Sequence, residues 1–276
     1  MNKVQWAVGG KGKAPGKMAP RRGSLVLVSM LGWLLAMMPA HAEEPQLGAE
    51  YQPLVQRVID AAKARDQQAL ARQIKYPFKR EYPIPAIKSP AEMLARFDEV
   101  FDDAILKRIA SSRAGQDWQA MGWRGIMLGN GEVWLDFDGK VIGINHQTAQ
   151  AAKRKAELVA KQKSDLHPSV REYKRPALMW QTEKFTIRID ELGDGRYRYA
   201  SWAKGKVLSD KPDLVLSNGI VRVEGTGGNH TYLFTSGPYR YECAVTVLGG
   251  QGMPPGELVV YQNEIAIMHQ PVIKVL

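Results

Sequence analysis

The chain has 276 residues, a formal net charge of +10 at pH 7 and a single cysteine. Apolar residues make up 45% of it and charged residues 24%, which excludes a disordered chain because such a composition can fill a hydrophobic core. One cysteine excludes an internal disulfide framework, and the length fits two modest domains.

The positive charge is concentrated at the start of the chain. Residues 1–42 contain six basic residues and no acidic one, which leaves 32 basic and 28 acidic residues in the rest. Beyond residue 42 the chain is therefore only slightly basic, and this argues against a nucleic-acid partner.

An apolar segment, residues 24–38, follows two arginines and precedes Ala-His-Ala, which ends at Ala42. A basic start, a short apolar core and a small-x-small site are the parts of a secretory signal peptide. We therefore expect residues 1–42 to be a signal peptide cleaved after Ala42, and the mature protein to be periplasmic.

The alternative for this segment is a membrane anchor. A spanning helix needs about 20 apolar residues, whereas this run is shorter and is broken by Pro39. No later segment is long and apolar enough to span a bilayer, so we expect no membrane span after removal of the signal. Translation from Met18 instead of Met1 would give a signal of more usual length, and the sequence leaves both starts open.

Residues 43–146 are predicted to form an α+β domain that begins with helices. Apolar residues recur at helical spacing from Leu54 onward, and Asp66 can cap a second short helix. Ser89-Pro90-Ala91-Glu92 supplies an N-cap, a proline at the first helical position and the glutamate of a capping box. The helix that it opens is expected to place Met93, Leu94, Phe97, Val100 and Phe101 on one face.

From Gly122 onward the apolar pattern has a period of two. Strands over 123–128, 132–137 and 140–145 are separated by Gly-Asn-Gly and Asp-Gly turns, which predict an antiparallel meander. Helices, the YPF segment, the capped helix and GWRGIMLGNGEVWLDF together resemble the nuclear-transport-factor-two-like and ketosteroid-isomerase-like cone superfamily. The resemblance implies a small cone-shaped domain, a fold that carries enzymes, ligand binders and interaction modules alike.

Residues 147–170 are rich in alanine and lysine and predict a basic helical linker. Residues 171–276 are predicted to be an all-β domain, because short alternating strands separated by glycine-rich turns are typical of a sandwich or small barrel. The expected strands are 185–189, 196–202, 219–223, 231–235, 239–247, 258–261 and 265–268. FTIRIDELGDGRYRYASW and GPYRYECAVTVL resemble an uncharacterised bacterial secreted-domain family, and this resemblance implies no activity.

Motifs for catalysis or metal binding are missing from the sequence. It contains no Gly-x-Ser-x-Gly elbow, no His-x-His or His-x-x-x-His pair and no glycine-rich phosphate loop. The segment 136–139 (DFDG) lacks the further oxygens of a calcium loop and predicts a hairpin turn. Cys243 occupies an alternating strand position that predicts a buried thiol. The sequence thus predicts no cofactor and no metal, and disfavours an enzyme without excluding one.

One enzyme hypothesis remains. Glu132, Trp134 and Asp136 share one face of their strand, and a carboxylate beside an indole in the concavity of a cone could act as a general base with a raised pKa. The alternative is a solvent-facing polar stripe. A cone filled by Trp123, Trp134 and Phe101 would leave no pocket.

Aromatic and basic residues alternate in the C-terminal strands. Such interleaving can bind single-stranded nucleic acid, but the predicted export and the near-neutral charge disfavour that role. We expect cross-strand aromatic packing, with the arginines on the solvated face. The residues are Tyr197, Tyr199, Tyr232, Phe234, Tyr239 and Tyr241, and Arg188, Arg196, Arg198 and Arg240.

A tight turn is predicted between two aromatic strands at Thr235-Ser236-Gly237-Pro238-Tyr239. Ser-Gly-x-Tyr at this place resembles the loop that periplasmic lysozyme inhibitors insert into the enzyme cleft. The resemblance implies that Ser236, Gly237 and Tyr239 bind and that Arg240 meets the paired catalytic carboxylates of a glycoside hydrolase. A purely structural hairpin is the alternative.

The sequence thus favours a non-enzymatic periplasmic binding protein, an inhibitor or immunity protein against a lysozyme-like peptidoglycan hydrolase. Two alternatives stay open. One is a small-molecule-binding or enzymatic cone domain with a carboxylate base, and the other is an envelope scaffold whose basic linker contacts anionic surfaces.

Overall fold

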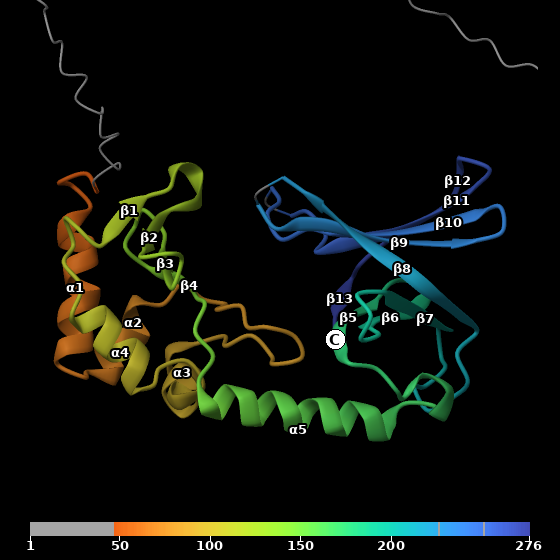
Figure 1. Ribbon diagram of the computed structural model, residues 1–276, viewed down its shortest axis with the longest axis horizontal. Helices are drawn as coiled ribbons and strands as arrows, with labels where there is room; N and C mark the ends of the chain where they lie inside the picture. Colours follow the sequence, from red (N-terminus) through yellow and green to blue (C-terminus); the bar gives the residue numbers. More distant parts are fainter. Residues whose placement is uncertain (1–46, 226, 251) are drawn as a thin grey trace, which may run out of the picture. The chain divides into compact units, whose positions relative to one another are not determined.

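The computed structural model describes residues 47–276 except Thr226 and Gln251, so the predicted signal peptide and its cleavage site lie outside the described residues. The fold is α+β, as the sequence predicts. Short helices and a four-stranded antiparallel sheet are followed by a long helix and a nine-stranded antiparallel sheet (Figure 1).

The first three helices lie where the sequence predicts them, and side chains cap the second and the third. They are α1 (Gln52–Lys63), α2 (Gln67–Gln73) and α3 (Pro90–Ala95). The Asp66 carboxylate accepts a hydrogen bond from the Ala69 amide at 2.9 Å, and the Ser89 hydroxyl accepts one from the Glu92 amide at 3.2 Å.

The predicted third helix is shorter than expected, and one further helix was missed. α3 ends at Ala95 and a 3-10 turn, η1 (Phe97–Glu99), follows, so Leu94 stays 37% exposed. Helix α4 (Asp103–Ala110) then begins with the Asp102 carboxylate accepting from the Ile105 amide at 3.0 Å.

The small sheet has the order β1-β2-β3-β4. Its strands are β1 (Trp118–Ala120), β2 (Ile126–Leu128), β3 (Val133–Leu135) and β4 (Val141–Ile144). The prediction that Trp123 lies in a strand is wrong, because it lies in the 3-10 turn η2 (Gly122–Arg124). Its side chain is 65% exposed, so it does not contribute to filling the interior. Gly122 and Gly125 flank this indole with φ of 57° and 101°, values that reverse the chain there.

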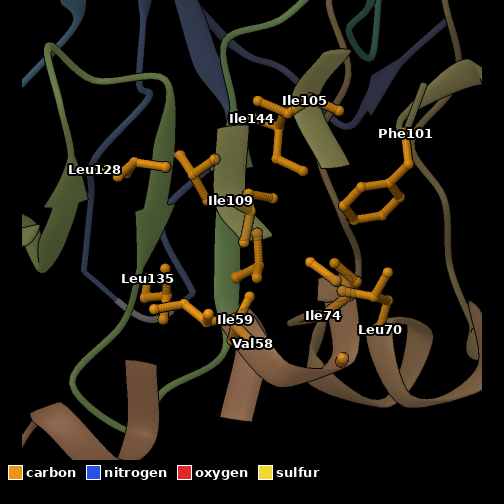
Figure 2. Packing of buried hydrophobic residues seen from close by; sticks show 14 of the residues in the cluster. Val58, Ile59, Leu70, Ile74, Phe101, Ile105, Ile109, Leu128, Leu135 and Ile144 are labelled. Atoms are coloured by element: carbon orange, nitrogen blue, oxygen red, sulfur yellow. The ribbon is translucent and has the colours of Figure 1, made fainter. Parts of the chain in front are cut away.

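The apolar faces of the helices pack on this sheet and fill the space between them (Figure 2). Phe101 is buried, its ring stacks on Phe97 with centroids 4.8 Å apart, and Trp118 is fully buried. The core also includes Val58, Ile59, Leu70, Ile74, Ile105, Ile109, Leu128, Leu135 and Ile144.

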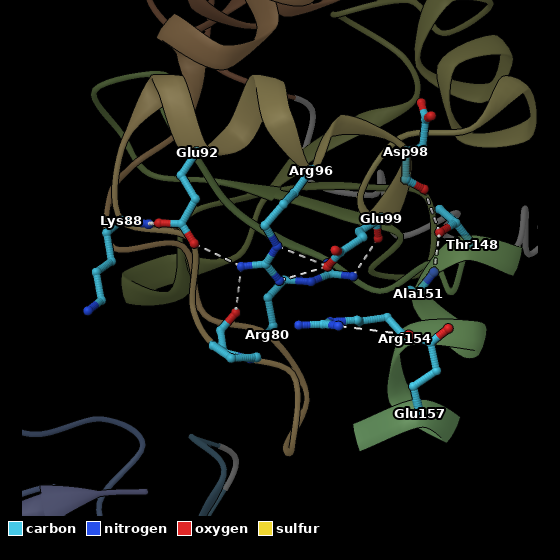
Figure 3. A network of polar contacts seen from close by, with 11 residues as sticks. Arg80, Lys88, Glu92, Arg96, Asp98, Glu99, Thr148, Ala151, Arg154 and Glu157 are labelled. Atoms are coloured by element: carbon cyan, nitrogen blue, oxygen red, sulfur yellow. Dashed lines mark hydrogen bonds and ion pairs between the residues drawn. The ribbon is translucent and has the colours of Figure 1, made fainter. Parts of the chain in front are cut away.

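The predicted linker helix is α5 (Ala149–Asp165). Its cap, Thr148, accepts a hydrogen bond from the Ala151 amide at 3.0 Å and donates one to the Asp98 carbonyl at 2.8 Å, which ties the helix start to the first part of the chain (Figure 3). Beside it, the Arg96 guanidinium donates to Glu92 and Glu99. No helix in the described part of the chain is long and apolar enough to cross a bilayer.

The C-terminal strands form one continuous antiparallel sheet in the order β12-β11-β10-β9-β8-β7-β6-β5-β13. β5 and β13, which the sequence did not reveal, lie at one end of this order. The bounds are β5 (Arg175–Gln181), β6 (Phe185–Glu191), β7 (Tyr197–Ala203), β8 (Leu214–Glu224), β9 (Asn229–Ser236), β10 (Tyr239–Val245), β11 (Gly256–Gln262), β12 (Ile265–Pro271) and β13 (Lys274–Val275).

Strand β8 joins the two halves of this sheet. Its first part, up to Gly219, pairs with β7, and its second part, from Ile220, pairs with β9. Asn218, just before this change of partner, has a positive φ of 64°. Trp180 and Ile187 from one half share a core with Phe234 and Leu258 from the other. The core is therefore enclosed by one curled sheet. The sequence predicts a sandwich or a small barrel instead.

Candidate functional site

The turn between β9 and β10 is exposed and conformationally fixed. Ser236 pairs with Tyr239, which leaves Gly237–Pro238 as a two-residue loop. Gly237 has a φ of 56°, and the ring of Pro238 holds its own φ near −65°, a combination typical of a type II′ hairpin turn. Ser236, Gly237 and Pro238 are all exposed, and open space surrounds the position of a Gly237 Cβ.

The strands behind this turn are stiffened by the predicted aromatic packing. Tyr197 lies 4.9 Å from Tyr232, and Tyr199 lies 5.7 Å from Phe234 and 5.8 Å from Tyr241, measured between ring centroids. Such cross-strand aromatic pairs stabilise a sheet beyond the area that they bury. Half-buried Tyr239 packs against the same core.

Arg240 is already neutralised by the protein itself. Its guanidinium forms ion pairs with Glu242 and, at 2.6 Å, with Glu264, and it lies over the Tyr261 ring at 4.1 Å from the centroid. A guanidinium that holds two carboxylates of its own chain is poorly placed to meet those of an enzyme. These contacts connect Arg240 of β10 to Glu264 and to Tyr261 of β11.

A second hairpin turn lies against the first. Gln262 pairs with Ile265, so Asn263–Glu264 is a two-residue loop, and its positive φ values of 47° and 66° are typical of a type I′ turn. The Asn263 amide donates to the Pro238 carbonyl at 3.0 Å. The sequence analysis missed this turn, although an asparagine between two alternating strands is a usable signal.

The alternative site on β3 does not have the electrostatics of a general base. Lys75 donates to the Asp136 carboxylate, and this hydrogen bond lowers the pKa of Asp136, whereas the hypothesis requires a raised value. Glu132 pairs with Arg108 at 2.8 Å. The Trp134 indole donates to the Gly131 carbonyl at 3.1 Å and lies beneath Arg124.

Two of the arginines predicted to be solvated are instead buried. Arg188 Nη2 lies 2.7 Å from Asp190 Oδ1, and Arg198 Nη2 lies 2.8 Å from Asp190 Oδ2. Arg198 also donates to the carbonyls of Val170 and Glu172. This face of β6 and β7 is covered by the segment after α5, which includes the 3-10 turn η3 (Pro168–Val170), so the arginines lie beneath it.

A chain of hydrogen bonds runs from this cluster to the first part of the protein. Arg188 donates to the Gln162 side-chain oxygen at 3.2 Å, and the Gln162 amide donates to the Tyr82 hydroxyl at 2.9 Å. Burial raises the pKa of the Tyr82 hydroxyl, which donates or accepts within this chain in its neutral form. The cluster therefore cross-links α5, β6 and the loop that carries Tyr82.

The remaining reactive groups of the described residues include a buried thiol and an exposed histidine–glutamate pair. Cys243 is buried as predicted, and burial raises the pKa of its thiol. The described part of the chain brings together no group of three or more His, Cys, Asp or Glu side chains that could hold a metal ion. A cleft of about 620 Å³ near Met253 and Ile273 also includes the paired side chains of Glu257 and His269.

No family model matches the chain, and no curated protein or solved structure matches it either. Its function is therefore inferred from the geometry of its own sites.

Proposed function

We propose that the protein is an exported, non-catalytic binding protein that recognises another protein through the turn formed by Ser236, Gly237, Pro238 and Tyr239. The observation that carries this proposal is the combination of exposure and a defined hairpin conformation in that turn. Its loop residues are exposed, while half-buried Tyr239 and the aromatic strands behind it pack against the core. A preorganised element loses little conformational entropy on binding.

The charged groups near both candidate sites support binding over catalysis. Asp136 is engaged by Lys75, Glu132 by Arg108, and Arg240 by two glutamates. Ser236 lies at the exposed end of β9, where its hydroxyl can donate to an acceptor on a partner.

The partner class that we propose is a lysozyme-like peptidoglycan hydrolase of the periplasm. Glycoside hydrolases carry two carboxylates beside the scissile bond, and these accept hydrogen bonds from whatever enters the cleft. A two-residue hairpin turn is among the narrowest structures a chain can present, so it fits such a cleft. The resemblance of Ser-Gly-x-Tyr to the loops of periplasmic lysozyme inhibitors supports the same partner.

The test is whether the protein inhibits purified lysozymes and lytic transglycosylases. Enzyme activity is monitored by the turbidity of a peptidoglycan suspension, and binding is measured by calorimetric titration. We expect Ser236→Ala to weaken inhibition about tenfold, which corresponds to the loss of one hydrogen bond to a charged acceptor. Ser209→Ala, at another exposed serine, serves as the control and should inhibit like the wild type. The proposal fails if no enzyme is bound, or if a Ser236→Ala/Tyr239→Ala double variant inhibits fully.

Export is tested separately. Residues 1–50 fused to a reporter that is active only in the periplasm should give reporter activity. N-terminal sequencing of the processed fusion should show that it starts at Glu43. A reporter that stays cytoplasmic would contradict the proposed location.

A further inference from the structure

Glu264 occupies a position that strongly favours glycine. It is the second residue of the Asn263–Glu264 turn and has a φ of 66°. Type I′ turns prefer Asn-Gly because both central residues need positive φ, which asparagine tolerates and which a longer L side chain adopts only at a cost. The chain therefore keeps a glutamate where its backbone conformation is unfavourable.

The local structure gains little from that side chain. Glu264 is 81% exposed, and its ion pair is with Arg240, which also holds Glu242 and stacks on Tyr261. Ion pairs of exposed carboxylates contribute little to stability. Residues kept in unfavourable backbone conformations concentrate at functional sites.

The turn lies beside the proposed contact. The hydrogen bond from the Asn263 amide to the Pro238 carbonyl holds the two loops together, and Ile265, the next residue, is 70% exposed. One surface therefore presents the Ser236 hydroxyl, the Glu264 carboxylate and a large apolar side chain. Two glutamates around one arginine give this surface a net negative charge, most of it exposed on Glu264.

We infer that Glu264 is a partner-contact residue that binds a lysine or arginine side chain at the rim of the site that Ser236 enters. The inference rests on the proposed function and adds the charge of the partner's surface. Charge complementarity acts mainly on association rate and specificity, so the rate of complex formation should depend on salt.

The test compares Glu264→Gln and Glu264→Gly with the wild type. The binding probes are a purified lysozyme of pI above 9 and the same enzyme with its lysines succinylated, which replaces positive charge by negative charge. We expect Glu264→Gln to slow association and weaken binding about tenfold. Succinylation should weaken binding of the wild type far more than binding of Glu264→Gln.

Thermal unfolding separates a binding role from a structural one. Glycine removes the backbone cost, so Glu264→Gly should raise the melting midpoint by about 2–4 °C while it weakens binding. Arg65→Gly is the control, because Arg65 also has a positive φ, 51°, and lies in the turn after α1. This variant should gain stability and bind like the wild type.

The outcomes distinguish this inference from the proposed function. If Ser236→Ala weakens binding and Glu264→Gln does not, the inference is wrong and the proposed function stands. If the wild type binds neither lysozymes nor lytic transglycosylases, both are wrong. A lower melting midpoint for Glu264→Gly would show that the carboxylate is structural and would overturn the inference on its own.

Discussion

Asp190 is the shared carboxylate partner of two buried arginines in the large sheet. Its side chain is 1% exposed and contacts Arg188 and Arg198, which are 0% and 8% exposed. Removing one partner of a buried ion pair leaves the other charge uncompensated in the poorly solvating protein interior. The resulting loss in the free energy of unfolding is far larger than the net stabilisation that the pair provides.

Asp190→Asn should therefore lower the free energy of unfolding by about 3–5 kcal/mol, measured by urea denaturation. Asp194→Asn is the matched control, because Asp194 also pairs with an arginine but lies in an exposed turn. Its effect should be far smaller, because solvent screens an exposed ion pair. Equal effects of the two substitutions would contradict a buried, solvent-excluded cluster.

The same residues show what alternation can and cannot predict. Alternation in β6, β7 and β9 correctly places Tyr199 and Phe234 on the core face. It also places Arg188 and Arg198 on the opposite face, but only the packing of the segment after α5 decides whether that face is solvated. Coverage by a distant segment has no local sequence signal, so the two arginines were assigned to solvent.

At the scale of elements, capping signals were the most reliable guide. Asp66 and Ser89 begin helices as predicted, because an N-cap hydrogen bond is made within one turn of the chain. The capped helix α4 carries the same kind of signal in Asp102 and in its apolar spacing, and was overlooked. Trp123 was assigned to a strand because its neighbours alternate, whereas the flanking glycines fold the segment into an exposed turn.

The ion pair between Lys75 and Asp136 connects the end of α2 to the turn after β3. The hydrogen bond lowers the pKa of Asp136 from 3.8 and raises the pKa of Lys75 from 10.5. For the carboxylate, the unfolded chain takes up its proton at higher pH than the folded protein, so this stabilisation is present above about pH 4 and is lost as pH falls further. For the lysine, it is present below about pH 10.5 and is lost above it.

We therefore expect Asp136→Asn to lower the free energy of unfolding by at most about 1 kcal/mol at pH 7, because both side chains are partly exposed. The difference from the wild type should shrink below pH 4, as measured by urea denaturation at a series of pH values. Asp60→Asn, which removes an exposed carboxylate of α1, serves as the control. A loss of the stabilisation already between pH 7 and 5 would indicate a raised pKa and would revive the general-base hypothesis.

At the scale of the whole molecule, the candidate surface depends on strand register. The turn at Gly237 was predictable because Ser-Gly-Pro between alternating strands is a local pattern. Its neighbour at Asn263 becomes part of the same surface only because β10 pairs with β11. Pairing between strands is decided by the assembled sheet, so the second turn and the role of Glu264 were beyond a reading of the sequence alone.

The two ends of the large sheet are connected by the last residues of the chain. The Val272 amide donates to the Gly256 carbonyl on β11, and the next amide, of Ile273, donates to the Gln181 carbonyl on β5. β13 then pairs with β5, and the Leu276 amide donates to Met179. Two successive residues thus bond to strands at opposite ends of the sheet order, and β13 covers the edge of β5.

Deletion of residues 273–276 should therefore lower the free energy of unfolding by about 1–3 kcal/mol and leave the edge of β5 open to pairing with other chains. Urea denaturation and light scattering at increasing protein concentration measure the two effects. An Ile273→Ser/Val275→Ser variant is the control, since both side chains are more than half exposed and the backbone hydrogen bonds remain. Only the deletion removes the hydrogen bonds to β5. If the double variant nevertheless loses as much stability as the deletion, side-chain burial and not edge pairing holds the end of the chain.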